Sequence, residues 1–397
     1  MYVITHGVPM PFSFSHLSAG LMAVLVGYTS SVAIIFQAAA AAGATSAQTA
    51  SWLWALGLGM GISSIGLSLY YRMPLLTAWS TPGAALLVTS LSGSSLGEAI
   101  GAFILSSALM LLLALSGGVD RVLRVLPRPL AAAMLAGVLL RFGINLFTPL
   151  PEAPLLILGM LGLFLLGRRF APRLVMVLVL VGGTLLAGSL MPLPLEEVTL
   201  SLTTPVWMSP SFSWHSLVGV GIPLFVVTMA SQNLPGMAVL HAHGYHPKAS
   251  PLIGWTGLIG LLLAPFGGFA YNLAAITAAI CMGKEVDEDP ARRWPATIWA
   301  GLFYLLSGLF AASVVNLFSA LPTALMAAIA GLALLGTIGN SLHGALAEEH
   351  SRESALITFL VTASGVSWLG IGSAFWGILL GTLVWTFWQN VPPKQVR

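Results

Sequence analysis

Long apolar runs, separated by short polar breaks, extend from Leu17 to Trp388 and constrain this chain more than any other feature. A helix needs roughly 20 predominantly apolar residues to cross the hydrocarbon core of a bilayer. Of the 397 residues, 57% are hydrophobic and only 7% are charged, whereas soluble globular domains average about 25% charged residues. A soluble fold of this length could not bury so much apolar surface. We therefore expect an integral membrane protein embedded in the lipid bilayer.

The apolar runs fall into two sets of seven. We predict an all-α polytopic membrane protein with fourteen transmembrane segments, near residues 17–41, 51–70, 76–91, 97–116, 130–147, 155–167 and 174–191, and then 217–239, 250–264, 268–282, 295–317, 322–340, 354–365 and 367–388. The 43 glycines and 24 prolines are compatible with this class, because a helix bundle in a membrane can satisfy backbone groups that such residues free.

The basic residues predict how the chain is oriented. If both termini are cytoplasmic, the cytoplasmic loops and tails hold fourteen of the fifteen Lys and Arg residues: Arg72, Arg121, Arg124, Arg128, Arg168, Arg169, Arg173, Lys248, Lys284, Arg292, Arg293, Arg352, Lys394 and Arg397. The remaining one, Arg141, falls within a run. The positive-inside rule therefore predicts cytoplasmic termini and an even number of crossings.

The two halves of the sequence also resemble each other. The stretch 126–137 has the pattern Leu-Pro, Leu, Ala-Ala and Ala-Gly, and the stretch 321–331 repeats it. Because seven is odd, two tandem copies of one unit must lie in opposite orientations. Such inverted repeats are typical of secondary transporters, which bind substrate near the midplane where the repeats meet. The alternative is that Leu, Ala and Gly recur by chance.

The third run of each half contains a break. Residues 73–79 have the pattern of extended chain, after which Thr81 can cap a helix that has Pro82 at its first position. In the second half, 265–269 interrupts the run and Asn272 can cap the next helix. Two half-helix N-termini in one cavity would attract an anion. The alternative is a pair of packing kinks.

A polar group lies in the middle of the eighth run. Gln232 and Asn233 have apolar sequence on both sides, and Thr228, four residues before Gln232, is expected on the same helix face. An unpaired amide is costly in the membrane. These side chains therefore either join helices through hydrogen bonds or bind the substrate.

The sequence argues against several other kinds of site. Cys281 is the only cysteine and lies in an apolar stretch, and no Asp or Glu lies well inside a run. The residues His241, His243 and His246 have no firm metal-ligand spacing. We therefore expect no catalytic residues, no metal and no cofactor. The formal net charge of +3 is too small to indicate a nucleic-acid partner.

Three stretches of this sequence resemble the BenE-type benzoate/proton symporter family, which is related to the nucleobase/ascorbate transporters. They are 75–89 (LLTAWSTPGAALLVT), 229–233 (MASQN) and 370–377 (GIGSAFWG). The similarity extends over nearly the whole chain. It implies two inverted repeats, with short strands and half-helices from segments 3 and 10 at the substrate site.

The resemblance also implies two structural domains. A cytoplasmic tail, 1–16, would precede a core domain formed by 17–117 and 217–317, and a gate domain would be formed by 122–192 and 320–389. Rocking or sliding of the core against the gate would move the substrate across the bacterial inner membrane. A homodimer is one assembly that we keep open.

One departure from the related nucleobase carriers bears on the substrate. Those carriers place glutamates in segments 8 and 10, where this chain has Gln232 and Asn272. An aromatic carboxylate is itself an acceptor and needs neutral donors. We predict import of benzoate or a related aromatic carboxylate with a proton, and substrate binding by Ser80, Thr81, Gln232, Asn233, Tyr271 and Asn272. The alternatives are a carrier of nucleobases or of inorganic anions.

Overall fold

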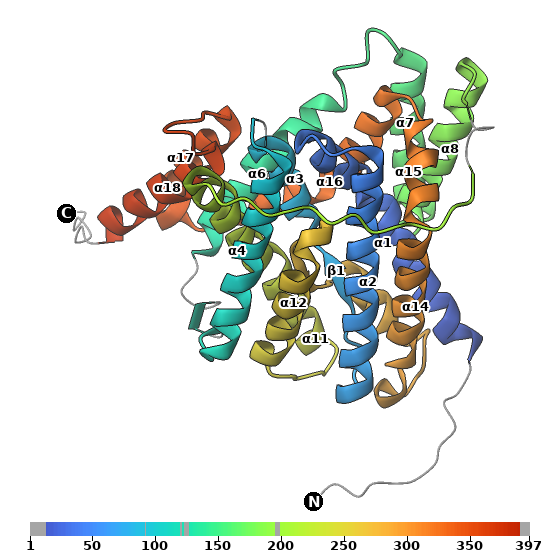
Figure 1. The fold of residues 1–397 in the computed structure, drawn as a ribbon, viewed down its shortest axis with the longest axis horizontal. Coiled ribbons are helices and arrows are strands. Elements are labelled where there is room, and N and C mark those ends of the chain that lie inside the picture. Colours follow the sequence, from blue (N-terminus) through green and yellow to red (C-terminus); the bar gives the residue numbers. More distant parts are fainter. Residues whose placement is uncertain (1–12, 92, 120, 123–126, 195–198, 390–397) are drawn as a thin grey trace, which may run out of the picture.

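The computed structural model describes residues 13–91, 93–119, 121–122, 127–194 and 199–389, and most of these are helical (Figure 1). In the first half the elements are α1 (Phe14–Ala41), α2 (Ser46–Tyr71), β1 (Thr77–Trp79), α3 (Thr81–Ser90), α4 (Leu96–Leu115), α6 (Arg128–Asn145), α7 (Pro154–Phe170) and α8 (Val175–Leu190).

The second half begins with a long helical segment that contains α9 (Trp214–Ser216), α10 (Ile222–Thr228) and α11 (Leu234–Ala242), joined by the π-helical turns Leu217–Gly221 and Met229–Asn233. The remaining elements are α12 (Ala249–Leu263), the 3-10 turn Ala264–Phe266, β2 (Tyr271–Leu273), α13 (Ile276–Cys281), the 3-10 turn Pro290–Arg292, α14 (Pro295–Leu309), α15 (Ala311–Ser319), α16 (Thr323–Leu346), the 3-10 turn Glu349–Ser351, α17 (Arg352–Ser364) and α18 (Ser373–Gln389).

Several helices have the length and apolar composition of a membrane span. Among the described residues six satisfy both criteria, or seven if the bent pair α14 and α15 forms one span. They are α1, α2, α4, the helical segment 214–242, the helical segment 249–266 and α16. A helical membrane protein is therefore confirmed. The fourteen crossings and the inverted repeats stay predictions.

The predicted segment 295–317 is present as two helices with a bend between them. Its two parts, α14 and α15, are bent by 64°. Thr203, from the segment that joins the two halves, takes up backbone hydrogen bonds at the bend. Its N–H donates to the Leu309 carbonyl and its hydroxyl accepts from the Ala312 N–H. A distant segment thus replaces bonds that the helix loses.

The same joining segment lies across the ends of several helices (Figure 1). The Met208 N–H donates to the Pro265 carbonyl, and the Ser211 N–H donates to the Gly97 carbonyl. These long-range bonds attach the segment to the helical bundle and satisfy its backbone groups.

A two-stranded antiparallel sheet lies among the helices, near the middle of the molecule (Figure 1). Strands β1 and β2 pair with Thr77 opposite Leu273, Ala78 opposite Asn272 and Trp79 opposite Tyr271. The extended breaks predicted in the third runs are therefore present, and they contact each other. Hydroxyls of α2 support β1: Ser63 and Ser64 hydrogen-bond the Thr77 side chain at 2.6 and 2.9 Å.

Small residues allow the helices to pack closely. A Cβ atom built on Gly57 of α2 would lie 2.7 Å from the Cα atom of Gly308 in α14. The helices α4 and α12 also pack on each other, as do α6, α16, α17 and α18. Close approach of this kind is the usual mode of helix association in membranes, where lipid is as apolar as the side chains.

Candidate functional site

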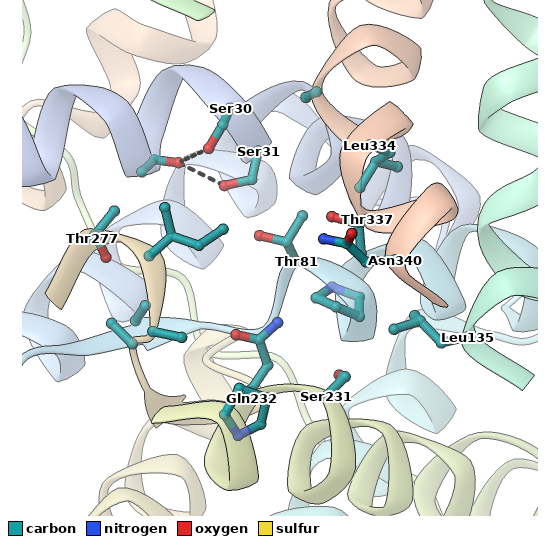
Figure 2. Close-up of a pocket in the computed structure, with 18 of the residues that line it drawn as sticks. Ser30, Ser31, Thr81, Leu135, Ser231, Gln232, Thr277, Leu334, Thr337 and Asn340 are labelled. Atoms are coloured by element: carbon teal, nitrogen blue, oxygen red, sulfur yellow. Dashed lines mark hydrogen bonds between the residues drawn. The ribbon is translucent and has the colours of Figure 1, made fainter. Parts of the chain in front are cut away.

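A cavity of about 680 Å³ lies beside the strand pair (Figure 2). One wall is formed by α1, β1, the start of α3, residues 227–235 and the segment 274–277. The other wall is formed by α6, α8 and α16. The volume lies in the range of small-molecule pockets, about 300–1,000 Å³.

Helix α3 begins at the cavity, but its cap differs from the prediction. Ser80, not Thr81, is the N-cap, because its hydroxyl accepts from the Gly83 N–H at 2.9 Å. The predicted cap is therefore wrong by one residue. Ser80 is fully buried, whereas Thr81 and Pro82 line the cavity. The Thr81 hydroxyl is free of hydrogen bonds to the described residues and can contact a ligand.

The second predicted cap is also wrong. Asn272 lies within β2, and α13 starts four residues later, at Ile276, without a side-chain cap. The Asn272 Nδ2 atom donates to the Ala270 carbonyl at 3.0 Å. Ala270 has a left-handed backbone with φ of 46°, so this bond stabilises a strained turn. Asn272 is fully buried and is not among the residues that line the cavity.

The polar group of the eighth run lies on a π-helical turn. Because a π-turn bonds i to i+5, it rotates the following side chains relative to an α-helix. Thr228 is fully buried and does not line the cavity, whereas Gln232 does. Of these two residues, only Gln232 is therefore accessible to a ligand. Figure 2 shows the Gln232 amide directed into the cavity toward Thr81.

Asn233 and Tyr271 hold the strand pair in place. The Asn233 Oδ1 atom accepts from the Leu273 N–H at 3.0 Å, and the Tyr271 hydroxyl donates to the Ala55 carbonyl at 2.7 Å. Both side chains are fully buried and lie outside the cavity lining. In this conformation they position the site, and their contact with substrate stays a prediction.

Helix α1 contributes Ser30 and Ser31 to the same wall, and both hydroxyls donate to the Gly27 carbonyl (Figure 2). The Trp79 indole N–H donates to the Ser31 hydroxyl at 2.7 Å. This bond fixes the Trp79 ring, which lines the cavity together with the Tyr304 side chain. Two aromatic side chains therefore border the site.

The predicted site residues do not include the polar side chains on the opposite wall. Thr337, Asn340 and Ser341 of α16 all line the cavity. The signal was present, since residues three and four apart lie on one helix face and these interrupt an otherwise apolar run. The residue Arg128, at the start of α6, also lines the cavity and was assigned only to a cytoplasmic loop.

The charge of the lining has one sign. Among the lining residues that the structure describes, Arg128 alone is charged, and none is Asp, Glu or His. A cavity lined by carboxylates, as expected for a nucleobase carrier, would instead carry negative charge. This wall chemistry favours an anionic ligand over a cationic one.

Comparison of the sequence with known families gives one match of almost full length. Residues 10–387 match the family described as BenE, benzoate membrane transport protein. The chain is 49% identical over 365 residues to the inner membrane protein YdcO of Escherichia coli, and the aligned region covers 92% of this chain and 93% of that protein. It is 42% identical over 377 residues to the benzoate membrane transport protein of Acinetobacter baylyi, covering 94% and 95%.

Two solved structures share the fold at low sequence identity. SLC26A9 matches with a TM-score of 0.63 at 12% identity, over 94% of this chain and 66% of that chain. The transmembrane domain of the cyanobacterial bicarbonate transporter BicA matches with a TM-score of 0.57 at 14% identity, over 97% and 99%. At such identities the likeness concerns the fold alone.

Proposed function

This chain belongs to the BenE family of benzoate membrane transport proteins, and from that premise we propose that it is a secondary transporter of benzoate or a closely related aromatic carboxylate. It is a membrane transport protein and not an enzyme. The family resemblance noted in the sequence is thereby confirmed, while the substrate of this particular chain belongs to the proposal.

The observation that carries the proposal is the chemistry of the cavity lining. Among the described residues, the walls are mostly apolar, they include hydrogen-bond donors without a partner, and they include no carboxylate. Trp79 and Tyr304 offer aromatic surface for a ring. Thr81 and Gln232 offer a hydroxyl and an amide that have no hydrogen-bond partner among the described residues. An aromatic acid presents one apolar end and one acceptor end, and the cavity matches both.

We further propose that the two walls belong to two domains that move against each other. The core would comprise 17–117 and 217–317, and the gate 122–192 and 320–389. Support comes from the cavity, which has α1, β1 and α3 on one side and α6, α8 and α16 on the other. Rocking or elevator-like sliding of the core would then expose the bound acid to each side in turn.

A co-transported proton completes the proposal, at the inner membrane and with both termini cytoplasmic. Moving one anion into a cell that is negative inside costs about 2.3 kcal/mol per 100 mV. A proton carried with it cancels the charge, so the membrane potential no longer opposes uptake. The charge argument favours symport with a cation, and the family resemblance favours the proton.

The test is benzoate counterflow and substrate-dependent internal acidification in liposomes that contain only this protein. We expect saturable uptake of labelled benzoate, accelerated by an inward proton gradient. Protein-free liposomes correct for passive entry of neutral benzoic acid. Uptake that does not saturate, or that matches the protein-free control, would contradict the proposal.

Competition separates the alternatives of the same fold. Unlabelled benzoate should abolish labelled uptake, whereas uracil, sulfate and bicarbonate should leave it unchanged. If sulfate or bicarbonate competes and benzoate does not, the chain is a carrier of inorganic anions. Competition by uracil alone would indicate a nucleobase carrier.

A further inference from the structure

The wall of the cavity formed by α6 and α16 carries a second set of groups that can bind an anion. Thr337, Asn340 and Ser341 line the cavity from α16, and their side chains have no hydrogen-bond partner among the described residues. Arg128 lines it from α6, is exposed, and has no ion-pair partner within the described parts of the chain. Unpaired donors that face a cavity are available to a ligand.

The packing of α6 on α16 orders these groups along the wall. Near the end of α16, a Cβ atom built on Gly344 would lie 3.5 Å from the Cβ atom of Ala132, near the start of α6. Nearer the start of α16, a Cβ atom built on Gly331 would lie 2.7 Å from the Cβ atom of Leu146, which follows the end of α6. The two helices are therefore antiparallel. Asn340 lies one turn from Gly344 on α16, and Arg128 lies one turn beyond Ala132 on α6. Two turns correspond to about 11 Å along the axes.

Thr81 and Gln232 line the same cavity from α3 and from the π-helical turn Met229–Asn233, and Figure 2 shows these two side chains around it together with those of Thr337 and Asn340. The cavity thus has two sets of uncommitted donors on two walls. A carboxylate has about four lone-pair sites on its two oxygen atoms, so it can accept hydrogen bonds from donors on both walls.

We infer that α16 and Arg128 contribute further carboxylate-binding groups to this cavity, in addition to Thr81 and Gln232. Asn340, Thr337 and Ser341 donate hydrogen bonds there. Arg128 supplies the charge that attracts the carboxylate. This inference rests on the proposed function, since it takes the same aromatic acid as its ligand.

A purely topological role for Arg128 makes a different prediction. Any basic residue of the same loop satisfies the positive-inside rule equally well. Arg121 lies seven residues earlier, is exposed, and is not among the lining residues, so it is the matched control. Only the binding role requires the charge at residue 128 itself.

The experiment measures benzoate binding to the purified protein at low and high salt. Arg128→Gln should weaken binding about threefold to tenfold at low salt, as expected for one charge near 10 Å in a partly solvated cavity. The loss should shrink at high salt, because the Debye length falls. Arg128→Lys and Arg121→Gln should bind as wild type, and Asn340→Ala should weaken binding at both salt concentrations.

A chemical variant keeps the test valid if Arg128→Gln does not fold. Arg128→Cys in a Cys281→Ala background can be purified and then modified with a positively or a negatively charged thiol reagent. We expect the positive adduct to bind more tightly than the negative one. Equal affinities of the two adducts, or equal losses in Arg128→Gln and Arg121→Gln, would overturn the inference. Wild-type protein that binds no benzoate would instead refute the proposed function.

Discussion

Gln232 and Asn233 are neighbours in the chain with different structural roles. The Gln232 amide faces the cavity and has no hydrogen-bond partner among the described residues. Asn233 is fully buried, and its Oδ1 atom accepts from the Leu273 N–H of β2. One residue is therefore available to the ligand, while the other holds a strand that borders the site.

This contrast predicts different effects for two alanine substitutions. Gln232→Ala should weaken benzoate binding about tenfold or more and leave the melting temperature unchanged, since a hydrogen bond to a charged group contributes roughly 1.5–3 kcal/mol. Asn233→Ala should lower stability, because the buried Leu273 N–H loses its acceptor at a cost of about 1–3 kcal/mol. Binding calorimetry and thermal unfolding in detergent measure the two effects. A stable Asn233→Ala protein would contradict the assigned role.

At the residue scale, two of the residues singled out from the sequence line the cavity. Thr81 was singled out as the cap of a helix that starts within a run, and Gln232 as a polar side chain with apolar sequence on both sides. Thr337 and Asn340 are also polar side chains in an apolar run, but α16 contains no break in the sequence pattern that would single them out. The inward direction of Gln232 and the buried direction of Asn233 depend on a π-turn, and residue types alone do not specify that turn.

At the scale of elements, the start of α3 combines local and long-range determinants. Ser80 caps the helix through its own side chain, which is a local signal that Ser-Thr-Pro-Gly provides. The Ser80 N–H, however, donates to the Ala270 carbonyl at 3.0 Å. The sequence could therefore predict that a helix begins here and that extended chain precedes it. It could not predict the partner strand or its register, which depend on residues about 190 positions away.

The position of Thr81 in the first turn leads to a prediction about charge. Thr81→Asp should preserve folding, because an acidic side chain is favourable at a helix N-terminus and Ser80 remains the cap. Its carboxylate would face the cavity and repel an anionic ligand. We expect benzoate affinity at neutral pH to fall at least tenfold, whereas the uncharged Thr81→Asn should lose less than threefold. Titration calorimetry compares the two variants, and equal affinities would exclude an anion at this position.

At the scale of the whole molecule, the two walls of the cavity meet again at a surface contact. Arg173, between α7 and α8, pairs with Glu285, which follows α13, at 3.3 Å. The Glu285 backbone N–H and then the Arg173 guanidinium hold the pKa of the Glu285 carboxyl below its ordinary value, so this carboxyl is ionised at neutral pH. The pair is exposed, and such pairs contribute little to stability. The pair is nevertheless informative about transport, because Arg173 belongs to the proposed gate domain and Glu285 to the proposed core domain.

If the core moves against the gate during transport, a covalent link at this contact must stop the cycle. The double variant Arg173→Cys, Glu285→Cys in a Cys281→Ala background provides that link when a bifunctional thiosulfonate reagent bridges the two cysteines, and Cys281 is buried in the wild-type protein. A bridging reagent is needed because a direct disulfide requires Cα atoms within about 7 Å, whereas this contact joins the ends of two long side chains. We expect cross-linking to reduce benzoate uptake in liposomes to the protein-free level and cleavage of the bridge with dithiothreitol to restore it. Benzoate binding should persist in the cross-linked protein, because the cavity is present in the linked arrangement. The two single-cysteine variants, treated identically, control for modification of one cysteine alone. Undiminished uptake by fully cross-linked protein would show that these two segments keep their distance throughout transport, and the division into a moving core and a gate would then be wrong.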